Sequence, residues 1–301
     1  MNQLYTPCLC KIKTLSNLHV GNGEVNYSVL DKQVQRDILT NFPTINATSL
    51  KGALRDFTNY SYDDINLANA VANTIFGSDP TQNADTNDKE DEKSSINKQG
   101  YVNFFDAKLL SLPARSDKKP FFRATSKEVL TLFKEYCESF GIACDLEVES
   151  ITPDTGGDVS IEEFDTKYAL QTKNRQLKDL IGEDCIVLED EDFRVLAKEL
   201  PFVARNYLEN GKSENLWYEE IVPRESIFYF VLQFPSESLL ASQENRAINL
   251  NRKKPDNEKL KGHFSKFQDL LNDTKLFIGA NTTVGYGYCE IKNFFCKKEN
   301  T

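Results

Sequence analysis

The segment IFYFVLQF, residues 227–234, constrains the fold more than any other part of the chain. It is a short, almost unbroken run of apolar and aromatic residues that begins soon after Pro223, and such a run predicts a buried β-strand. Residues 4–16 alternate and are rich in Leu, Ile and Cys, which is typical of a half-buried strand. The chain closes at 276–296 as a strand, a glycine loop and a strand. Strands that are not adjacent in the sequence, mixed with few helices, predict an α+β domain with long loops.

Helical patterns lie between these strands. Apolar residues recur at helical spacing from 50 to 57, with Thr48 or Ser49 placed as the N-cap. Thr125 and Glu128 form a capping-box signal for a second helix. A polar helical stretch is expected around 236–272, after the IFYFVLQF strand.

Two polar or acidic regions interrupt these patterns. Residues 78–100 are polar almost throughout, which predicts a flexible insertion or a disordered loop. Residues 145–200 are acidic and mixed, and the segment DCIVLEDEDFRVLAKEL within them suggests a strand that leads into a short helix. We find no internal repeat, signal peptide or long apolar run, and we therefore expect a single domain over 1–301 with no membrane-spanning helix.

The distribution of charge limits the kind of nucleic-acid contact that is possible. A net charge of −10 argues against a protein that coats nucleic acid with its whole surface. Basic residues nevertheless gather at Lys51 and Arg55, at 115–123 and at 246–266, which is compatible with one RNA-facing side. Seven cysteines without a Cys-x-x-Cys pair, and only two histidines, provide no usual zinc ligand set and predict reduced thiols in a cytoplasm.

Two segments offer phosphate-binding chemistry. At the expected helix start SLKG, unpaired N–H groups and the positive end of the helix would attract a phosphate beside Ser49, Lys51 would add a charge, and Gly52 would let a backbone approach. The alternative is an ordinary amphipathic helix with solvated Lys51 and Arg55. The second segment is the glycine loop IGANTTVGYGY, residues 278–288.

Glycines 279, 285 and 287 would let a sugar-phosphate chain approach the backbone of that loop, whose amides could bind phosphate. The spacing fits neither a Walker nor a Rossmann motif, and a tight hairpin with a bulge remains the alternative. Asp31 follows the turn HVGNGE and has only Asp37 as a nearby carboxylate. It is either a turn residue or a ligand for a Mg²⁺ ion that substrate phosphate largely holds.

In combination, HVGNGE, the aspartate that follows it, FPTINATSLKGALR and IGANTTVGYGY closely resemble the RAMP superfamily of CRISPR RNA-binding proteins. Within it the match is best to the repeating backbone subunit of type III-B (Cmr) effector complexes. IFG, NFFDAKLLSLPARS and LWYEEIVPRES agree and keep the family's order, so that the resemblance runs from residue 5 to 290. The last two segments favour type III-B over the type III-A backbone counterpart.

The resemblance implies a modified ferredoxin-like, RRM-type palm with an inserted thumb hairpin, which we expect at about 145–200. Copies would stack head to tail into a helical filament along the CRISPR guide RNA, an interface that does not close on itself. Base pairing with the guide would recognise the sequence of the target RNA, whereas the protein would bind the RNA backbone. The implied partners are guide RNA, target RNA, further copies of the chain, the large Cas ten-type subunit and the small subunit, with no membrane.

The resemblance also implies an endoribonuclease of antiviral defence that cuts target RNA at regular intervals. Asp31 matches the aspartate that this family requires for cleavage, which is attack of the target's own 2′-hydroxyl on the adjacent phosphorus, assisted by Mg²⁺ or Mn²⁺. Asp31 could be the base, a metal ligand shared with RNA phosphate, or a positioning group. His19 could orient the loop or contact RNA, or be a structural histidine; Glu219 and Glu220 could assist or form salt bridges.

Lys51 and Arg55 are expected to bind guide phosphates, followed by the amides around Gly285. One alternative is a catalytically silent guide-binding scaffold. Another is a guide-processing endonuclease of the same superfamily, which commonly relies on histidine acid–base chemistry; it is less favoured because the chain has only His19 and His263.

Overall fold

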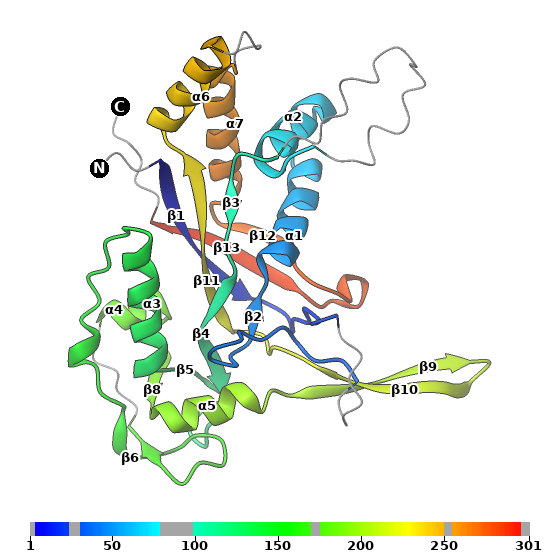
Figure 1. Ribbon diagram of the computed structural model, residues 1–301. Coiled ribbons are helices and arrows are strands. Elements are labelled where there is room, and N and C mark those ends of the chain that lie inside the picture. The colour runs from blue at the N-terminus through cyan, green and yellow to red at the C-terminus, as the bar shows by residue number, and fades with distance from the viewer. Residues whose placement is uncertain (1–3, 24–30, 79–98, 170–174, 250–254, 296–301) are drawn as a thin grey trace.

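The computed structural model describes residues 4–23, 31–78, 99–169, 175–249 and 255–295. Segments from both ends of the chain contribute to one nine-stranded sheet (Figure 1). Its strands are β1 (Tyr5–Thr14), β2 (Thr44–Ile45), β3 (Asn103–Phe104), β4 (Ala107–Ala114), β5 (Phe122–Ser126), β8 (Cys185–Leu188), β11 (Ile227–Pro235), β12 (Thr274–Phe277) and β13 (Tyr288–Phe295).

The order across the sheet is β12-β13-β1-β11-β4-β5-β8, with β2 paired to β4 and β3 paired to β11. All of these pairs are antiparallel except β5 with β8, so the sheet is mixed. This confirms an α+β fold whose strands pair across long stretches of sequence. The helices of the described residues are α1 (Ala47–Tyr60), α2 (Ile65–Phe76), α3 (Lys127–Ser139), α4 (Arg175–Leu180), α5 (Asp190–Lys198), α6 (Glu237–Asn249) and α7 (Asn257–Leu270).

The apolar segment IFYFVLQF forms β11, which helices cover on both faces. The ring of Tyr229 lies 4.9 Å from that of Phe133 in α3, and the ring of Phe234 lies 6.4 Å from that of Phe267 in α7, between centroids. Tyr229 and Phe234 are an odd number of positions apart, so their side chains point to opposite faces of the sheet. Burial on both faces explains why this strand has no polar side.

The start of α1 differs from the prediction. The helix begins at Ala47 with Asn46 as its N-cap residue, so that Thr48 and Ser49 lie inside the first turn. The reason is a remote partner: the Ala47 N–H group donates to a carboxylate oxygen of Asp106 at 2.7 Å. A side chain 59 positions away thus satisfies the first amide, and no local capping residue is needed at the predicted place.

The start of α3 is also shifted, by one residue. Ser126, not Thr125, caps this helix and accepts from the Val129 N–H group at 3.4 Å. The Thr125 hydroxyl is used elsewhere, since it donates to the Leu110 carbonyl oxygen of the neighbouring strand at 2.9 Å. The predicted stop is confirmed: Gly141 follows the helix with a positive φ of 68°.

A long hairpin, β9 (Phe202–Glu209) and β10 (Lys212–Glu220), projects away from the main sheet (Figure 1). We expected a thumb hairpin at about 145–200, and this hairpin begins just after that region. Within the acidic region 145–200, β8 instead extends the main sheet beside β5, and α5 follows β8. This confirms the predicted strand that leads into a short helix. Two further short strands, β6 (Thr155–Ser160) and β7 (Lys167–Tyr168), pair only with each other.

Most of the predicted insertion at 78–100 lies outside the described residues. Among the helices that are described, we find none with the length and apolar character needed to cross a bilayer. Cys8 is disulfide-bonded, so the expectation of reduced thiols is wrong for this residue. Within the described ranges, Cys10, Cys137, Cys144 and Cys289 carry thiols that are not disulfide-bonded.

Candidate functional site

Three chain segments that are remote in sequence meet at the base of the β9–β10 hairpin. They are the loop after β1, the end of β10 and the glycine loop between β12 and β13. Backbone hydrogen bonds join them: Ala280 N–H donates to the His19 carbonyl oxygen at 2.9 Å, and Glu220 N–H donates to that of Lys32 at 2.9 Å. Leu18 and Val222, both buried, form a bridge beneath this junction. Apolar burial and backbone pairing therefore fix where the polar side chains lie.

Asp31 is exposed and yet firmly held at this junction. Its carboxylate Oδ2 accepts the Tyr218 N–H group at 2.8 Å, and its own N–H group donates to the Tyr218 carbonyl oxygen at 3.1 Å. Together with His19, Lys32 and Trp217 it lines a cavity of about 550 Å³, which we call the Asp31 cavity. A carboxylate presented in this way is fixed in place by one backbone donor but still open to a ligand.

His19 lies at the buried side of the same cavity. Its Nδ1 is 2.7 Å from the Glu220 carbonyl oxygen, and because a carbonyl only accepts, Nδ1 carries the proton. Its Nε2 lies 3.3 Å from a carboxylate oxygen of Glu219. A Cβ at Gly21 would lie 3.1 Å from Nε2, so a glycine lets the loop pass close over the imidazole ring. His19 thus ties the loop of Asp31 to β10.

Glu219 joins all three segments through a carboxylate whose side chain is only 2% exposed. Besides facing His19, it accepts Arg205 Nε at 2.6 Å and Asn281 Nδ2 at 2.7 Å. The Arg205 guanidinium in turn lies 4.5 Å from the centre of the Tyr286 ring. A buried carboxylate requires such partners, and this one links the hairpin to the glycine loop.

Glu220, like Glu219, is not among the residues that line the Asp31 cavity, and its carboxylate has different partners. Successive side chains on a strand face opposite ways, and its carboxylate pairs with Arg36 at 2.5 Å and accepts the Val34 N–H group at 3.0 Å. The structure therefore places Asp31 and His19 at one cavity, with Glu219 in contact with His19. Glu220 instead holds Val34 and Arg36, which follow Asp31 in the chain.

A second cavity, about 700 Å³, lies between α1 and the β12 side of the glycine loop, and we call it the α1 groove. Ser49, Gly52 and Gly279, all singled out in the sequence, line it together with Lys275. A Cβ at Gly52 would meet no atom within 4 Å, so the helix backbone is open at this point. Three of the predicted RNA-binding residues thus converge on one concave surface.

The other predicted phosphate contacts are placed differently. The expected open helix end at SLKG is wrong, because α1 begins at Ala47 and the Asp106 carboxylate takes its first amide. Lys51 does not line the α1 groove; its ammonium lies 5.8 Å from the centre of the Phe104 ring, and burial lowers its pKa. Arg55 is likewise not among the residues of the groove.

The glycine loop is a tight turn as well as a groove wall. A Cβ at Gly287 would lie 2.1 Å from the Ile278 carbonyl oxygen, and φ at Gly287 is +77°. The amide of Gly285 donates to the Thr282 carbonyl oxygen at 3.0 Å, so it is not open to phosphate as we expected. Of the three glycines, Gly279 is the one that lines the α1 groove.

Several site residues escaped the sequence analysis. Lys32 and Trp217 line the Asp31 cavity, with the Lys32 ammonium 5.1 Å from the centre of a Trp217 ring. Arg205 and Asn281 hold Glu219 from positions 14 and 62 residues away. Two of them carried a usable signal, since Lys32 directly follows Asp31 and Trp217 is the chain's single tryptophan.

No group of three or more His, Cys, Asp and Glu side chains in the described ranges could hold a metal ion. Asp31 is the one carboxylate among the described residues that line its cavity. A single carboxylate fits an oxygen-seeking ion such as Mg²⁺ when phosphate oxygens and water supply the other ligands.

Residues 11–290 match the model of the RAMP superfamily, and the chain belongs to this superfamily. It is 27% identical to the CRISPR system Cmr endoribonuclease Cmr4 of Pyrococcus furiosus, with 94% of both chains covered. It is 36% identical over 105 residues to the CRISPR system CMR subunit Cmr4 of Saccharolobus solfataricus, which covers 35% of this chain and 28% of that one.

Solved structures agree on the fold. The chain is similar to one in the cryo-EM structure of the type III-B Cmr-beta complex in its apo state, with a TM-score of 0.71, 22% identity and 99% of both chains covered. It is also similar to the crystal structure of oligomeric Cmr4 from Pyrococcus furiosus, with a TM-score of 0.64, 22% identity and coverage of 96% of this chain and 98% of that one. These comparisons confirm the family resemblance and the α+β fold.

Proposed function

We propose that this protein is the guide-RNA-binding backbone subunit of a type III-B CRISPR effector complex and cuts target RNA paired to the guide. The observation that carries the proposal is Asp31: an exposed carboxylate, fixed by the Tyr218 backbone, in a cavity at the base of a projecting hairpin. Its partners would be the guide, the target, further copies of the chain and the other Cmr subunits, including the large Cas ten-type subunit, in the cytoplasm.

The hairpin 202–220 is the best candidate for the thumb, and the main sheet for a ferredoxin-like palm. Phe202, Tyr207 and Leu216 are large apolar residues of this hairpin that are more than half exposed, and Leu216 also lines the Asp31 cavity. Apolar side chains that enter a base stack unstack it and bend the strand. A hairpin of this kind would displace a base pair next to Asp31 and leave the target backbone free to rearrange.

The α1 groove would hold the guide backbone. Gly52 and Gly279 allow close approach of a sugar-phosphate chain, and Lys275 supplies a cation at the same wall. Because each copy would contact only a short stretch of guide, a few cations are enough despite the net charge of −10. The Glu219 network connects this groove to the Asp31 cavity through Asn281.

The proposed reaction is internal attack on the target RNA. A bond forms between the 2′-oxygen and the adjacent phosphorus, and the bond from phosphorus to the 5′-oxygen breaks, which leaves a 2′,3′-cyclic phosphate. The proton of the 2′-hydroxyl passes to a base or to water, and the leaving 5′-oxygen takes up a proton from water. Asp31 would act at the reacting nucleotide, while His19 and Glu219 are positioning residues that keep its loop against β10. Geometry supplies much of such a rate, because attacking and leaving oxygens must align.

Asp31 would also hold a Mg²⁺ or Mn²⁺ ion together with RNA phosphate oxygens. Such an ion supplies stabilisation of the charge that develops on the phosphoryl oxygens.

The test is an Asp31→Asn variant, which keeps the shape and removes the charge. In a complex assembled on guide RNA, we expect cleavage of complementary target to fall by about 10²-fold or more, as for loss of a group that transfers a proton. Guide binding should stay within about twofold of wild type. Asp158→Asn, an exposed aspartate on β6, is the matched control and should cut normally.

Two results contradict this assignment. If Asp31→Asn loses guide binding together with cutting, Asp31 is a structural residue. If the wild-type complex binds guide and target but never cuts, the protein is a silent scaffold. Specific cutting of unprocessed repeat RNA by the isolated chain would instead indicate the guide-processing class.

A further inference from the structure

The turn at residues 37–41 presents two large apolar side chains to solvent, and we call it the apolar turn. Ile38 is 98% exposed and Leu39 is 95% exposed, more than any other large hydrophobic residue among those described. Single exposed apolar residues are common on protein surfaces, but two adjacent ones that are almost fully exposed in an ordered turn favour a contact with another molecule.

The apolar turn is held in shape by its own polar residues. A carboxylate oxygen of Asp37 accepts the N–H groups of Leu39 and Thr40, each at 3.0 Å. The other oxygen pairs with Lys108 at 2.6 Å. Asn41 adopts a left-handed backbone with φ of +59°, which closes the turn. A surface fixed before binding loses little conformational entropy on contact, so it is suited to serve as an anchor.

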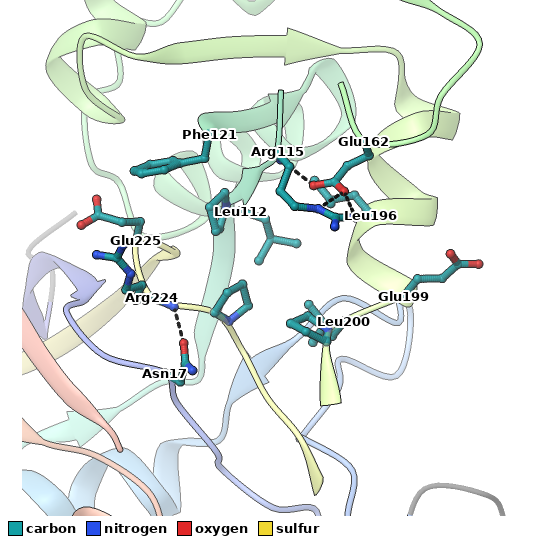
Figure 2. A pocket seen from close by; sticks show the side chains of 13 residues that line it. Asn17, Leu112, Arg115, Phe121, Glu162, Leu196, Glu199, Leu200, Arg224 and Glu225 are labelled. Carbon is teal, nitrogen blue, oxygen red and sulfur yellow. Dashed lines mark hydrogen bonds and ion pairs between the residues drawn. The ribbon is translucent and has the colours of Figure 1, made fainter. Parts of the chain in front are cut away.

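The same chain carries a hollow with matching chemistry, which we call the Leu196 cavity (Figure 2). It measures about 490 Å³, and since a cavity of about 150 Å³ holds a benzene molecule, it has room for two branched side chains. The ion pair between Arg115 and Glu162, at 2.7 Å, stands beside its apolar wall. The apolar residues that line it are Leu112, Pro113, Phe121, Leu196, Leu200, Pro201 and Pro223.

The apolar turn cannot fold back into the cavity of its own chain without losing its anchors. Arg36, directly before the turn, donates to the carbonyl oxygens of Ala197 at 2.9 Å and Lys198 at 3.2 Å, which binds it to the last turn of α5. A head-to-tail interface between identical chains needs two different, complementary patches on each copy. The apolar turn and the Leu196 cavity are such a pair.

We propose that the apolar turn of one copy docks into the Leu196 cavity of the next copy in the filament. This proposal rests on one part of the proposed function, the assembly of copies into a filament, and does not depend on RNA cleavage. Both surfaces also carry polar groups beside their apolar part: Thr40 and Asn41 belong to the turn, and Glu199 and Arg224 line the cavity. The partner is thus a second copy of this chain.

The test uses two complementary variants. Ile38→Ser/Leu39→Ser removes the exposed side chains of the apolar turn and leaves the Leu196 cavity unchanged. Leu196→Arg fills the Leu196 cavity and leaves the apolar turn unchanged. With guide RNA, we expect each variant alone to form filaments at least tenfold less readily than wild type by mass photometry. Mixed in equal amounts, they should form two-subunit species and nothing longer, because each pair has one intact contact. Val195→Ser, on the same helix outside the cavity, is the control and should assemble normally.

A crosslink keeps the test valid if Leu196→Arg does not fold. A short bis-maleimide should join Leu39→Cys to Leu200→Cys of a neighbouring copy, and it should not join Tyr60→Cys, equally exposed on α1, to the same position. The proposal is overturned if the Ile38→Ser/Leu39→Ser variant assembles normally, or if Leu39→Cys and Leu200→Cys of neighbouring copies do not crosslink. Normal assembly with loss of another Cmr subunit also overturns it and assigns the turn to that subunit. If the wild-type protein assembles but does not cut target RNA, only the proposed function is contradicted.

Discussion

Replacing Glu219 by Gln tests whether a buried carboxylate organises the candidate site. The substitution keeps the size of the side chain, but the Arg205 guanidinium loses the charge that it pairs with at 2.6 Å. Arg205 is itself only 20% exposed, so water replaces the lost partner poorly. The amide oxygen of Gln can still accept one hydrogen bond, so the perturbation is the loss of charge together with one of the described acceptor contacts.

The magnitude follows from these contacts. Removing one member of a fully buried ion pair costs about 3–5 kcal/mol, and a lost hydrogen bond to a charged group costs about 1.5–3 kcal/mol. Because Arg205 keeps partial access to water and Gln keeps one acceptor, we expect the free energy of unfolding to fall by about 2 kcal/mol. A domain with a typical stability of about 5–15 kcal/mol remains folded after such a loss.

Urea denaturation measures this effect, and target cleavage by the assembled complex measures its consequence for the site. We expect cleavage to fall at least tenfold, since Glu219 is what holds the His19 loop and the glycine loop to the hairpin. Glu214→Gln, on an exposed position of the same strand, should change neither quantity. A Glu219→Gln variant with wild-type stability and wild-type cleavage would refute the role of this carboxylate.

Three further predictions use other parts of the structure. Gly287→Ala should cost about 3 kcal/mol or more in urea denaturation, because its Cβ would meet the Ile278 carbonyl oxygen at 2.1 Å in a left-handed backbone; wild-type stability would contradict this. Gly52→Ala and Gly262→Ala, both in open helix positions, should each stabilise by about 0.5–1 kcal/mol, but only Gly52→Ala should weaken guide binding in a filter assay. Burial, with nearby lysines, lowers the pKa of His263, so the unfolded chain takes up a proton first as pH falls below about 6.5, and stability decreases there; His263→Gln should remove that slope in denaturation at pH 5 and 7.5.

Much of the sheet was predictable from the sequence, because strands that are half or fully buried carry a pattern of their own. β1 alternates, β11 is apolar except at Gln233, and both lie where the patterns placed them. The start of α1 was not predictable in this way, since its first amide is satisfied by Asp106 and its N-cap residue by Gln35, through contacts that only the folded chain creates. Local capping rules consider only residues that are close in the sequence, so they cannot predict a contact with a residue that is close only in space.

The projecting hairpin was missed for a different reason. Residues 212–216, KSENL, are exposed on both sides of the strand and mostly polar, so they show no alternation that would mark a strand. Asn210 and Gly211, both with positive φ, form the tight turn and were the available signal. The resemblance pointed to Asp31, His19, Glu219 and Glu220 alike. It did not point to the hydrogen bonds that hold them, because these join positions up to about 200 residues apart.

The most direct measurement asks which target nucleotide occupies the Asp31 cavity. A photo-crosslinker attached at Asn215→Cys, on the exposed wall of this cavity, would be activated in a guide–target complex that carries Asp31→Asn to prevent cutting. We predict crosslinks at regular intervals along the target, at the nucleotides beside each wild-type cut. Crosslinks confined to the guide, or to target positions remote from the cuts, would show that cleavage takes place somewhere else.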